Sequence, residues 1–307
     1  MPASASSLLV VGSVAFDTIQ TPHGKQERIL GGSATYFSLA ASYFTNVRVI
    51  AVVGEDFTPA HEAVMTGRGV DTRGIQRAKG KTFHWAGEYG DNLNEAKTHL
   101  TELNVFEDFK PQVPPEFAGS EFLFLANIDP VLQAQVRRSM PHVKLTGGDT
   151  MNFWIGGKRR ELQETLKLVD ILLINDGEAK MLAEDNSLPR AAHKIRAMGP
   201  KALVIKHGEY GATIFFADHK HPFRAPALPL DEVRDPTGAG DSFAGGFMGY
   251  IAAQGKLDRE VLKRAMFYGG VMGSFAVERF GTERLQSLTR DEIEARFQLF
   301  RELTHLE

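Results

Sequence analysis

The chain has 307 residues, of which 43% are hydrophobic and 24% charged, as in an ordinary soluble globular protein with one large domain or two small ones. Its net charge of −3 argues against broad electrostatic binding to nucleic acid, and the absence of cysteine excludes disulfides, thiolate catalysis and cysteine-based zinc sites. No apolar stretch reaches the ~20 residues of a membrane span, and the first apolar run is too short for a signal peptide, so we expect a cytoplasmic protein that does not bind membranes.

Apolar runs of strand length recur along the chain, and several are separated by segments with helical spacing of apolar residues. The strand-like runs are residues 8–11, 47–53, 122–125, 170–174, 202–205 and 213–216, and the clearest helical segments are 36–44 and 191–198. This alternation predicts an α/β fold, with a mostly parallel sheet covered by helices on both faces. The glycine pairs at 147–148 and 156–157 indicate turns.

Two segments interrupt this alternation. Residues 17–30 are polar, with Pro22 and Gly24 near the middle, which predicts a short hairpin. Residues 75–103 contain an aromatic-rich run, a polar stretch and a partly alternating run, which predicts extra strands. At the C-terminus, Thr289 followed by Glu292 predicts the beginning of a helix over residues 289–303.

The most informative run spans residues 235–243, where two closely spaced glycines precede a carboxylate and an apolar, helix-like segment. The glycines allow a sharp turn that directs the backbone N–H groups of Gly238, Ala239 and Gly240 at one point, next to the positive end of a helix dipole. This arrangement predicts a pocket for an anion such as a phosphoryl group, with Asp241 placed to accept a proton from an attacking hydroxyl. Taken alone, a GxGD motif more often indicates an ordinary glycine-rich turn before a helix, with Asp241 as a first-turn helix charge, but the full run is much more specific.

The complete run from Asp235 to Phe247 resembles the C-terminal signature of the ribokinase-like (PfkB) family of carbohydrate and nucleoside kinases. Further matches extend from Gly12 to about Gly281, in the family's order. The resemblance implies a single domain over residues 1–307, with a three-layer α/β core and a small β-sheet lid formed by about 17–30 and 75–103. It also implies dependence on ATP and Mg²⁺, with Asp241 as the catalytic base.

Near the N-terminus, Asp17 matches the family's aspartate for acceptor hydroxyls, and Gly31, Gly32 and Ser33 resemble its di-glycine substrate loop. A carboxylate can accept two hydroxyl hydrogen bonds, and glycines allow a ligand to approach closely. Many members carry Asn three residues after the position of Ser33, where this chain has Tyr36. The difference removes an amide contact that is common in sugar kinases and leaves the identity of the acceptor open.

Two further motifs resemble the nucleotide site of the family. Asn175 and Glu178 match an Asn-x-x-Glu motif that organises Mg²⁺ through water near the nucleotide phosphates, although the same residues suit a helix N-cap and its first turn. The segment from Lys206 to Gly211 matches the glycine-rich turn that lies along the nucleotide, with Gly208 closest. A hairpin turn explains this segment nearly as well.

A monovalent-cation site, such as one for K⁺, is implied by the resemblance at Asp235, with backbone carbonyls near Ala276 and Gly281. In many ribokinase-like enzymes the corresponding aspartate helps hold a cation that orders the anion pocket. A simple strand-end turn before Pro236 is the alternative role for Asp235.

Several other side chains have more than one possible role. Asp149 and Asn152 follow a strand-like run and could face the cleft or cap a helix at the surface. Phe83, Trp85 and Tyr89 on the implied lid could stack on a ligand, pack within the lid or contact a second subunit. Lid sheets in this family often form homodimers, and the sequence leaves the oligomeric state open.

These observations predict an ATP- and Mg²⁺-dependent kinase that phosphorylates a primary hydroxyl of a sugar or a sugar-containing compound. Two alternatives remain. One is a nucleoside kinase of the same family, which the aromatic lid and Tyr36 favour. The other is a ligand-binding or regulatory protein that kept the fold without turnover, against which the intact Asp241 and the Asn175–Glu178 pair argue.

Overall fold

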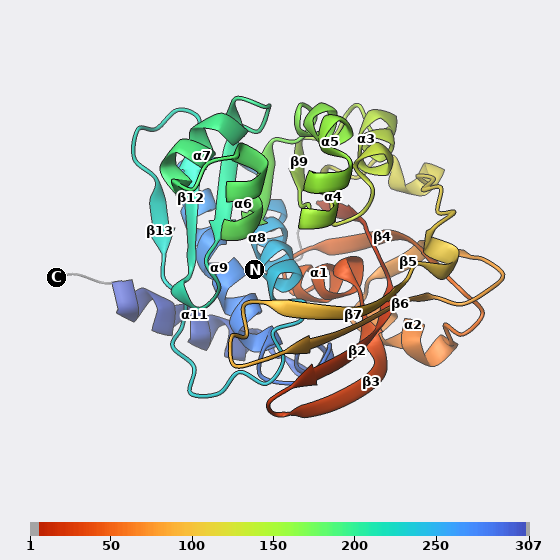
Figure 1. The fold of residues 1–307 in the computed structure, drawn as a ribbon. Helices are drawn as coiled ribbons and strands as arrows, with labels where there is room; N and C mark the ends of the chain where they lie inside the picture. The colour runs from red at the N-terminus through yellow and green to blue at the C-terminus, as the bar shows by residue number, and fades with distance from the viewer. Residues whose placement is uncertain (1–5, 305–307) are drawn as a thin grey trace.

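One large sheet organises residues 6–304, the part of the chain that the computed structural model describes (Figure 1). Within these residues it has nine strands, of which those from β11 to β5 pair in parallel, while β12 and β13 are antiparallel at one edge. In sheet order the strands are β13 (Phe223–Ala225), β12 (Ala212–Phe216), β11 (Ala202–Lys206), β10 (Ile171–Asn175), β9 (Leu145–Gly148), β8 (Phe122–Leu125), β1 (Ser7–Val11), β4 (Asn46–Val53) and β5 (Asp71–Arg77).

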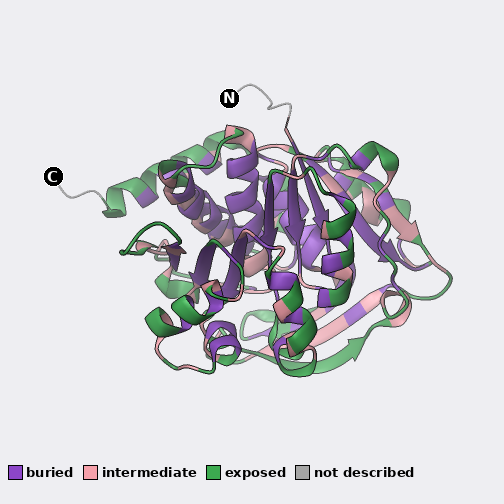
Figure 2. Cartoon of the chain, turned by 90° about the horizontal axis from the view of Figure 1, so that it is seen from above, coloured by how far each residue is buried: buried purple, intermediate pink, exposed green. Residues whose placement is uncertain are grey.

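The central strands are apolar on both faces. In β1, Leu8 and Val10 belong to one hydrophobic core, and Leu9 and Val11 belong to another. Strands β8, β10 and β11 alternate in the same way. Because both faces are buried, these strands appear in the sequence as continuous apolar runs rather than as an alternating pattern. Figure 2 shows the buried strands in the middle of the molecule, with helices whose outer sides are exposed.

Helices cover both faces, which confirms the predicted three-layer α/β core. On one face lie α1 (Ser33–Ala41), α2 (Pro59–Thr66), α8 (Ala239–Gln254), α9 (Arg259–Ala276), α10 (Glu283–Ser287) and α11 (Arg290–Thr304). On the other lie α3 (Pro130–Ser139), α4 (Asn152–Gly157), α5 (Arg159–Leu166), α6 (Asp176–Ala183) and α7 (Leu188–Arg196). None of the helices in residues 6–304 combines the length and apolarity needed to cross a bilayer.

A separate small sheet contains β3 (Gly24–Gly31), β2 (Ala15–Thr21), β6 (Phe83–Tyr89) and β7 (Ala96–Glu102), in that order. The hairpin predicted at 17–30 corresponds to β2 and β3. Of the predicted lid segment 75–103, residues 75–77 instead end β5, where they pair with β4 of the large sheet. This sheet lies along one side of the core in Figure 1, and all residues of its edge strand β7 are exposed.

Some element boundaries differ from those predicted. Gly147 and Gly148, predicted as a turn, lie in β9. A Cβ atom at Gly147 would come within 2.8 Å of Met248 Sδ, so the close packing of α8 on the sheet requires a residue without a side chain. Gly156 and Gly157, also predicted as a turn, end α4. The helices predicted at 36–44 and 191–198 each begin three residues earlier, because their first turns contain residues such as Ser33 that do not follow the apolar spacing.

Helix α8 carries glycines on the side that faces α1. A Cβ atom at Gly245 would overlap the carbonyl oxygen of Phe37 and come within 2.8 Å of Ala40 Cβ. The α1 and α8 backbones therefore approach more closely than side chains on both helices would allow. This contact matters for function, because α1 begins at the di-glycine loop and α8 begins at the glycine-rich signature.

We expect the substitution Gly245→Ala to lower the free energy of unfolding by about 1–3 kcal/mol, because overpacking forces the two helices apart. Gly157→Ala serves as the control, since a Cβ atom there meets nothing within 4 Å. Urea denaturation would measure both variants. Equal stability of Gly245→Ala and the wild type would show that the α1–α8 contact is not tight.

Candidate active site

The carboxyl ends of the parallel strands bring several predicted residues to one edge of the large sheet. Asp149 follows β9, Asn175 ends β10 and Lys206 ends β11. Ligands of open parallel sheets bind at this edge. The first turn of α8, which carries Asp241, lies beside Lys206, because a Cβ atom at Gly240 would come within 3.0 Å of Lys206 Nζ.

The glycine-rich signature forms the entry to α8, as its sequence predicts. Gly238 is the N-cap residue, with φ of 74°, a conformation that glycine adopts without steric cost. The N–H of Ala239 donates to the carbonyl oxygen of Pro236 at 3.2 Å, so this predicted anion donor is engaged in the turn. The sixteen residues of α8 direct the positive end of their dipole at the same place.

Asp241 is surrounded by protein, and its environment changes its acidity. Burial, assisted by the negative charge of Asp149, raises the pKa of Asp241 to about 7, although Lys206 acts in the opposite direction. A carboxylate with a pKa near neutrality suits general-base catalysis, since it can hold a proton taken from a substrate and release it again.

Asp149, which the sequence left undecided between cleft and surface, lies in the site. Its side chain is buried, its Oδ1 accepts the N–H of Thr150 at 2.7 Å, and its Oδ2 lies 3.7 Å from Lys206 Nζ. Burial raises the pKa of Asp149. Burial alone would lower the pKa of Lys206, but Asp149, Glu178 and Asp241 together raise it. Asn152, in contrast, is exposed in the first turn of α4.

Asn175 and Glu178 form a reciprocal capping box at the start of α6. Asn175 Oδ1 accepts the N–H of Glu178 at 2.9 Å, and Glu178 Oε2 accepts the N–H of Asn175 at 2.8 Å. Burial and the neighbouring Asp149 raise the pKa of Glu178 to about 7. Within residues 6–304 no cluster of three His, Asp or Glu side chains is arranged to hold a metal ion directly. Asn175 and Glu178 carry oxygen donors, the kind of group that Mg²⁺ prefers and that it often contacts through its water ligands.

The predicted acceptor loop lies at the end of β3. Asp17 on β2 is buried against Gly31, where any Cβ atom would overlap its carboxylate. Gly32 is the N-cap residue of α1, with φ of 93°, and its backbone hydrogen-bonds the Asp17 carboxylate. Burial, with the charge of Asp235, raises the pKa of Asp17 to about 7. Ser33 is engaged internally, because its hydroxyl lies 3.1 Å from that of Ser13.

Tyr36 connects the acceptor loop to the signature. Its ring lies directly against Gly238, where a Cβ atom would overlap the ring. Its Oη is buried and has no hydrogen-bond partner among the described residues. Burial, followed by the charges of Asp17 and Asp235, raises the pKa of Tyr36 well above its usual value.

Asp235 holds the signature loop in place. Its side chain is completely buried, with Oδ1 accepting the N–H of Thr237 at 2.9 Å and Oδ2 accepting the N–H of Gly281 at 2.8 Å. The N–H of Asp235 donates to the carbonyl oxygen of Val277, one residue beyond Ala276, at 3.3 Å. The predicted cation residues are therefore brought together, and Gly281 contributes an N–H group to this contact. Both carboxylate oxygens of Asp235 therefore accept backbone N–H groups of the surrounding loops.

The segment from Lys206 to Gly211 connects β11 and β12 as an antiparallel hairpin, with Gly208 in a left-handed conformation. Asn94, in the loop between β6 and β7, lies against Gly208, where any Cβ atom would overlap the Asn94 amide. The tip of the small sheet thus reaches the strand edge of the large sheet. A second contact joins the two sheets where Tyr89 Oη and Thr237 Oγ1 lie 3.2 Å apart.

The other two aromatic residues of the small sheet pack within their own surroundings. The ring of Phe83 stacks on Phe106 at 5.4 Å, and Trp85 Nε1 donates to Thr98 Oγ1 on the neighbouring strand. Only Tyr89 of the three extends to the signature loop in the contacts of the described residues.

Comparisons with known proteins agree with this geometry. The model of the pfkB family carbohydrate kinases matches residues 5–288. The chain is 29% identical over 249 residues to the cytidine kinase of Thermococcus kodakarensis, covering 78% of this chain and 87% of that protein. It is 25% identical over 295 residues to the nucleoside kinase of Methanothermobacter thermautotrophicus, covering 90% and 91%. The nucleoside kinase of Burkholderia thailandensis, solved in complex with ADP-inosine, matches with a TM-score of 0.77 and 21% identity, over 98% of this chain and all of that one.

The fold and the family match define a kinase, an enzyme that transfers a phosphoryl group to an acceptor. The chain belongs to the PfkB family of carbohydrate kinases. Membership implies ATP as the phosphoryl donor and Mg²⁺ as its metal ion.

The raised pKa values of the site have a consequence for stability. Asp17, Glu178 and Asp241 bind protons more tightly when folded than when unfolded, since their pKa values of about 7 lie above the usual range. Their contribution to the free energy of unfolding is complete below about pH 4 and is lost as the pH rises to about 7. We therefore expect the melting temperature of the ligand-free protein to fall between pH 5 and pH 8.

Asp241→Asn should make this fall shallower and should melt a few degrees above the wild type at pH 8, because it removes a buried charge. The exposed Asp291→Asn should follow the wild type. A melting curve of Asp241→Asn that matches the wild type at both pH values would mean that Asp241 is solvated.

Proposed function

We propose that the protein transfers the γ-phosphoryl group of ATP to a primary hydroxyl on the sugar ring of a nucleoside. The observation that supports transfer most directly is the position of the half-buried Asp241 in the first turn of α8, next to Lys206 and three residues after the left-handed Gly238. The sequence alone favours a sugar acceptor, with a nucleoside as the alternative. The relatives named as a cytidine kinase and a nucleoside kinase favour the nucleoside.

In the proposed reaction, Asp17 and the Gly31–Gly32 loop orient the acceptor. Asp241 takes the hydroxyl proton while the acceptor oxygen bonds to the γ-phosphorus, and the bond from that phosphorus to the bridging β–γ oxygen breaks to release ADP. Negative charge on the transferred group faces the N-terminus of α8 and Lys206, which stabilise it. In this proposal Lys206 stabilises the transferred phosphoryl group, in addition to making the nucleotide contact that its position in the sequence predicts.

Two cations fit this arrangement. Mg²⁺ would reach Asn175 and Glu178 through its water ligands and neutralise the nucleotide phosphates. A monovalent cation such as K⁺ would be held by Asp235 with carbonyl groups near Ala276 and Gly281, and it would offset the buried charge that orders the signature loop. Both assignments rest on the type of donor atom available, which is oxygen at each site.

The small sheet acts as the lid in this proposal. Its contacts at Asn94–Gly208 and Tyr89–Thr237 enclose the edge where the acceptor and nucleotide would meet. Excluding water there would favour transfer to the acceptor over hydrolysis of ATP.

Asp241→Asn provides the central test. With ATP, Mg²⁺ and K⁺, the wild type should form ADP in the presence of at least one acceptor from a panel of cytidine, inosine, adenosine, ribose and fructose. The variant should lose about 10²- to 10⁴-fold in kcat with little change in nucleotide affinity, because it removes only the proton acceptor. Asp291→Asn is the matched control.

If nucleotide binding collapses together with turnover, Asp241 has a structural role instead. ATP binding without turnover on any nucleoside or sugar would favour the non-catalytic alternative.

The Tyr36 hydroxyl, which is buried without a hydrogen-bond partner among the described residues, predicts that the acceptor is recognised through one of its sugar hydroxyls. A buried hydroxyl without a partner costs about 1–3 kcal/mol, and a sugar hydroxyl held by Asp17 would supply that partner. We expect Tyr36→Phe to reduce kcat/KM by about tenfold for the ribonucleoside, and to leave kcat/KM unchanged for whichever 2′- or 3′-deoxy analogue lacks the bonded group.

The melting temperature of ligand-free Tyr36→Phe should equal or exceed that of the wild type. Equal losses on the ribonucleoside and on both deoxy analogues would show that the Tyr36 hydroxyl does not contact the sugar.

A further inference from the structure

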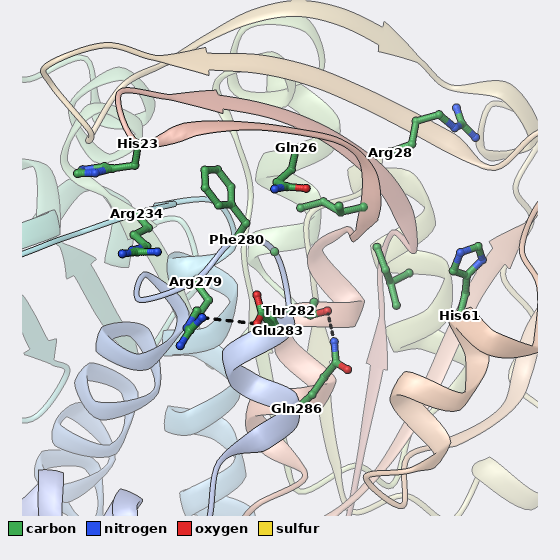
Figure 3. A pocket seen from close by; sticks show the side chains of 13 residues that line it. His23, Gln26, Arg28, His61, Arg234, Arg279, Phe280, Thr282, Glu283 and Gln286 are labelled. Carbon is green, nitrogen blue, oxygen red and sulfur yellow. Dashed lines mark hydrogen bonds and ion pairs between the residues drawn. The ribbon is translucent and has the colours of Figure 1, made fainter.

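A second pocket, of about 570 Å³, lies between β3, α2 and the loop that follows α9 (Figure 3). Its described lining residues include none of the active-site residues Asp17, Asp149, Glu178, Lys206 and Asp241. This volume is in the range of small-molecule sites. The pocket therefore lies outside the region where acceptor and nucleotide would meet, although it shares Gly281 with the predicted cation site and adjoins the loops that build the kinase site.

The lining of this pocket is rich in cationic and hydrogen-bonding groups. Figure 3 shows Arg28 on the β3 side, with Arg234 and Arg279 across from it, and His23 and His61 at opposite ends. Among the described lining residues Glu283 is the one carboxylate. The three arginine side chains favour an anionic ligand, and each of them also has one carboxylate partner.

Each arginine retains donors for a ligand. Arg28 contacts Asp56 at 2.8 Å, Arg234 contacts Glu232 at 2.9 Å, and Arg279 lies 3.7 Å from Glu283. These pairs are solvent-exposed, so each contributes little to stability. A guanidinium group has five N–H donors, and a single carboxylate partner leaves several of them available.

The backbone conformation of Arg28 is unusual for a residue with a long side chain. Arg28 has φ of 50°, a left-handed conformation that is unfavourable for a residue with a side chain. Its N–H donates to Thr18 Oγ1 at 3.1 Å, which holds the irregular pairing of β2 and β3 at this point. The strain places a long cationic side chain, rather than the glycine that this conformation favours, at the rim of the pocket.

We propose that this pocket binds a small phosphate ester of about nucleoside monophosphate size. Guanidinium groups recognise phosphate oxygens with paired hydrogen bonds. The remaining lining offers the flat ring of Phe280 and the amides of Gln26 and Gln286, which suit a base or another planar polar group. The volume exceeds what inorganic phosphate alone would fill.

The pocket is directly connected to the active site. Its lining residue Gly281 donates to Asp235, and Arg234 precedes Asp235 in the chain. On the other side, Leu30 precedes the Gly31–Gly32 acceptor loop. A ligand in the pocket thus contacts both segments that hold the anion-binding turn and the acceptor, which makes it suited to regulate the kinase.

Calorimetric titration of the full chain with AMP tests the proposal. The titration is run with and without saturating Mg²⁺–ADP, which occupies the nucleotide site. AMP should bind in both cases, and Arg279→Gln and Arg28→Gln should each weaken that binding about tenfold or more, because each removes a charge-assisted contact. Adenosine, which lacks the phosphate, should bind this pocket at least tenfold more weakly.

The control is Arg138→Gln, an exposed arginine on α3 of the opposite face, which should bind AMP as the wild type does. Melting temperatures would confirm that the variants are folded. Loss of AMP binding when Mg²⁺–ADP is present, or unchanged affinity in both pocket variants, would overturn the proposal. A nucleoside kinase also binds a nucleoside monophosphate as its product in the acceptor site, so only the AMP binding that Arg28→Gln and Arg279→Gln weaken is assigned to this pocket. Failure of the kinase proposal would leave that part of the binding unchanged.

Discussion

The concentration of buried negative charge at one edge of the large sheet is the constraint on which the site depends. Asp149, Glu178 and Asp241 meet around one cation, Lys206, and Asp17 lies on the acceptor side. Buried carboxylates repel each other and lose hydration, so they bind protons or cations readily. A magnesium nucleotide would relieve this repulsion while it places its own phosphates at the N-terminus of α8. Binding of the donor and organisation of the base are therefore one electrostatic event.

Glycine makes this concentration of groups possible. Gly31 lets the Asp17 carboxylate lie against the backbone, and Gly238 lets the Tyr36 ring lie against the anion-binding turn. Gly245 does the same for the helices α1 and α8 behind them. A side chain at any of these three positions would overlap neighbouring atoms. Glycine is therefore required there by the available space, and not only by the backbone conformation. The acceptor loop and the signature loop thus lie at the same end of one closely packed helix pair.

The sequence predicted the layered fold and much of the site because both depend on local patterns. Continuous apolar runs indicate strands that are buried on two faces, and the glycine-rich signature is contiguous in the chain. The strand-like run before Asp149 was predicted to end at a glycine turn, whereas β9 continues to Gly148, because packing against α8 requires a glycine at position 147, which no local pattern reveals. The location of Asp149 was undecided for a related reason, because its partner Lys206 lies on another strand. Asn175 and Glu178 form a capping box with the same side chains that the magnesium motif would use, so the two interpretations of this motif are compatible. The roles assigned to the site residues in catalysis remain predictions.

The contacts between the tip of the small sheet and the large sheet bear on the pace of the reaction cycle. Asn94 lies against Gly208, and Tyr89 reaches Thr237. If the small sheet is the lid of the proposed reaction, a bulky acceptor can enter and its phosphorylated form can leave only when these contacts separate. An opening movement of β6 and β7 would then belong to each catalytic cycle, and it would set the upper limit on the rate wherever the chemical step is fast.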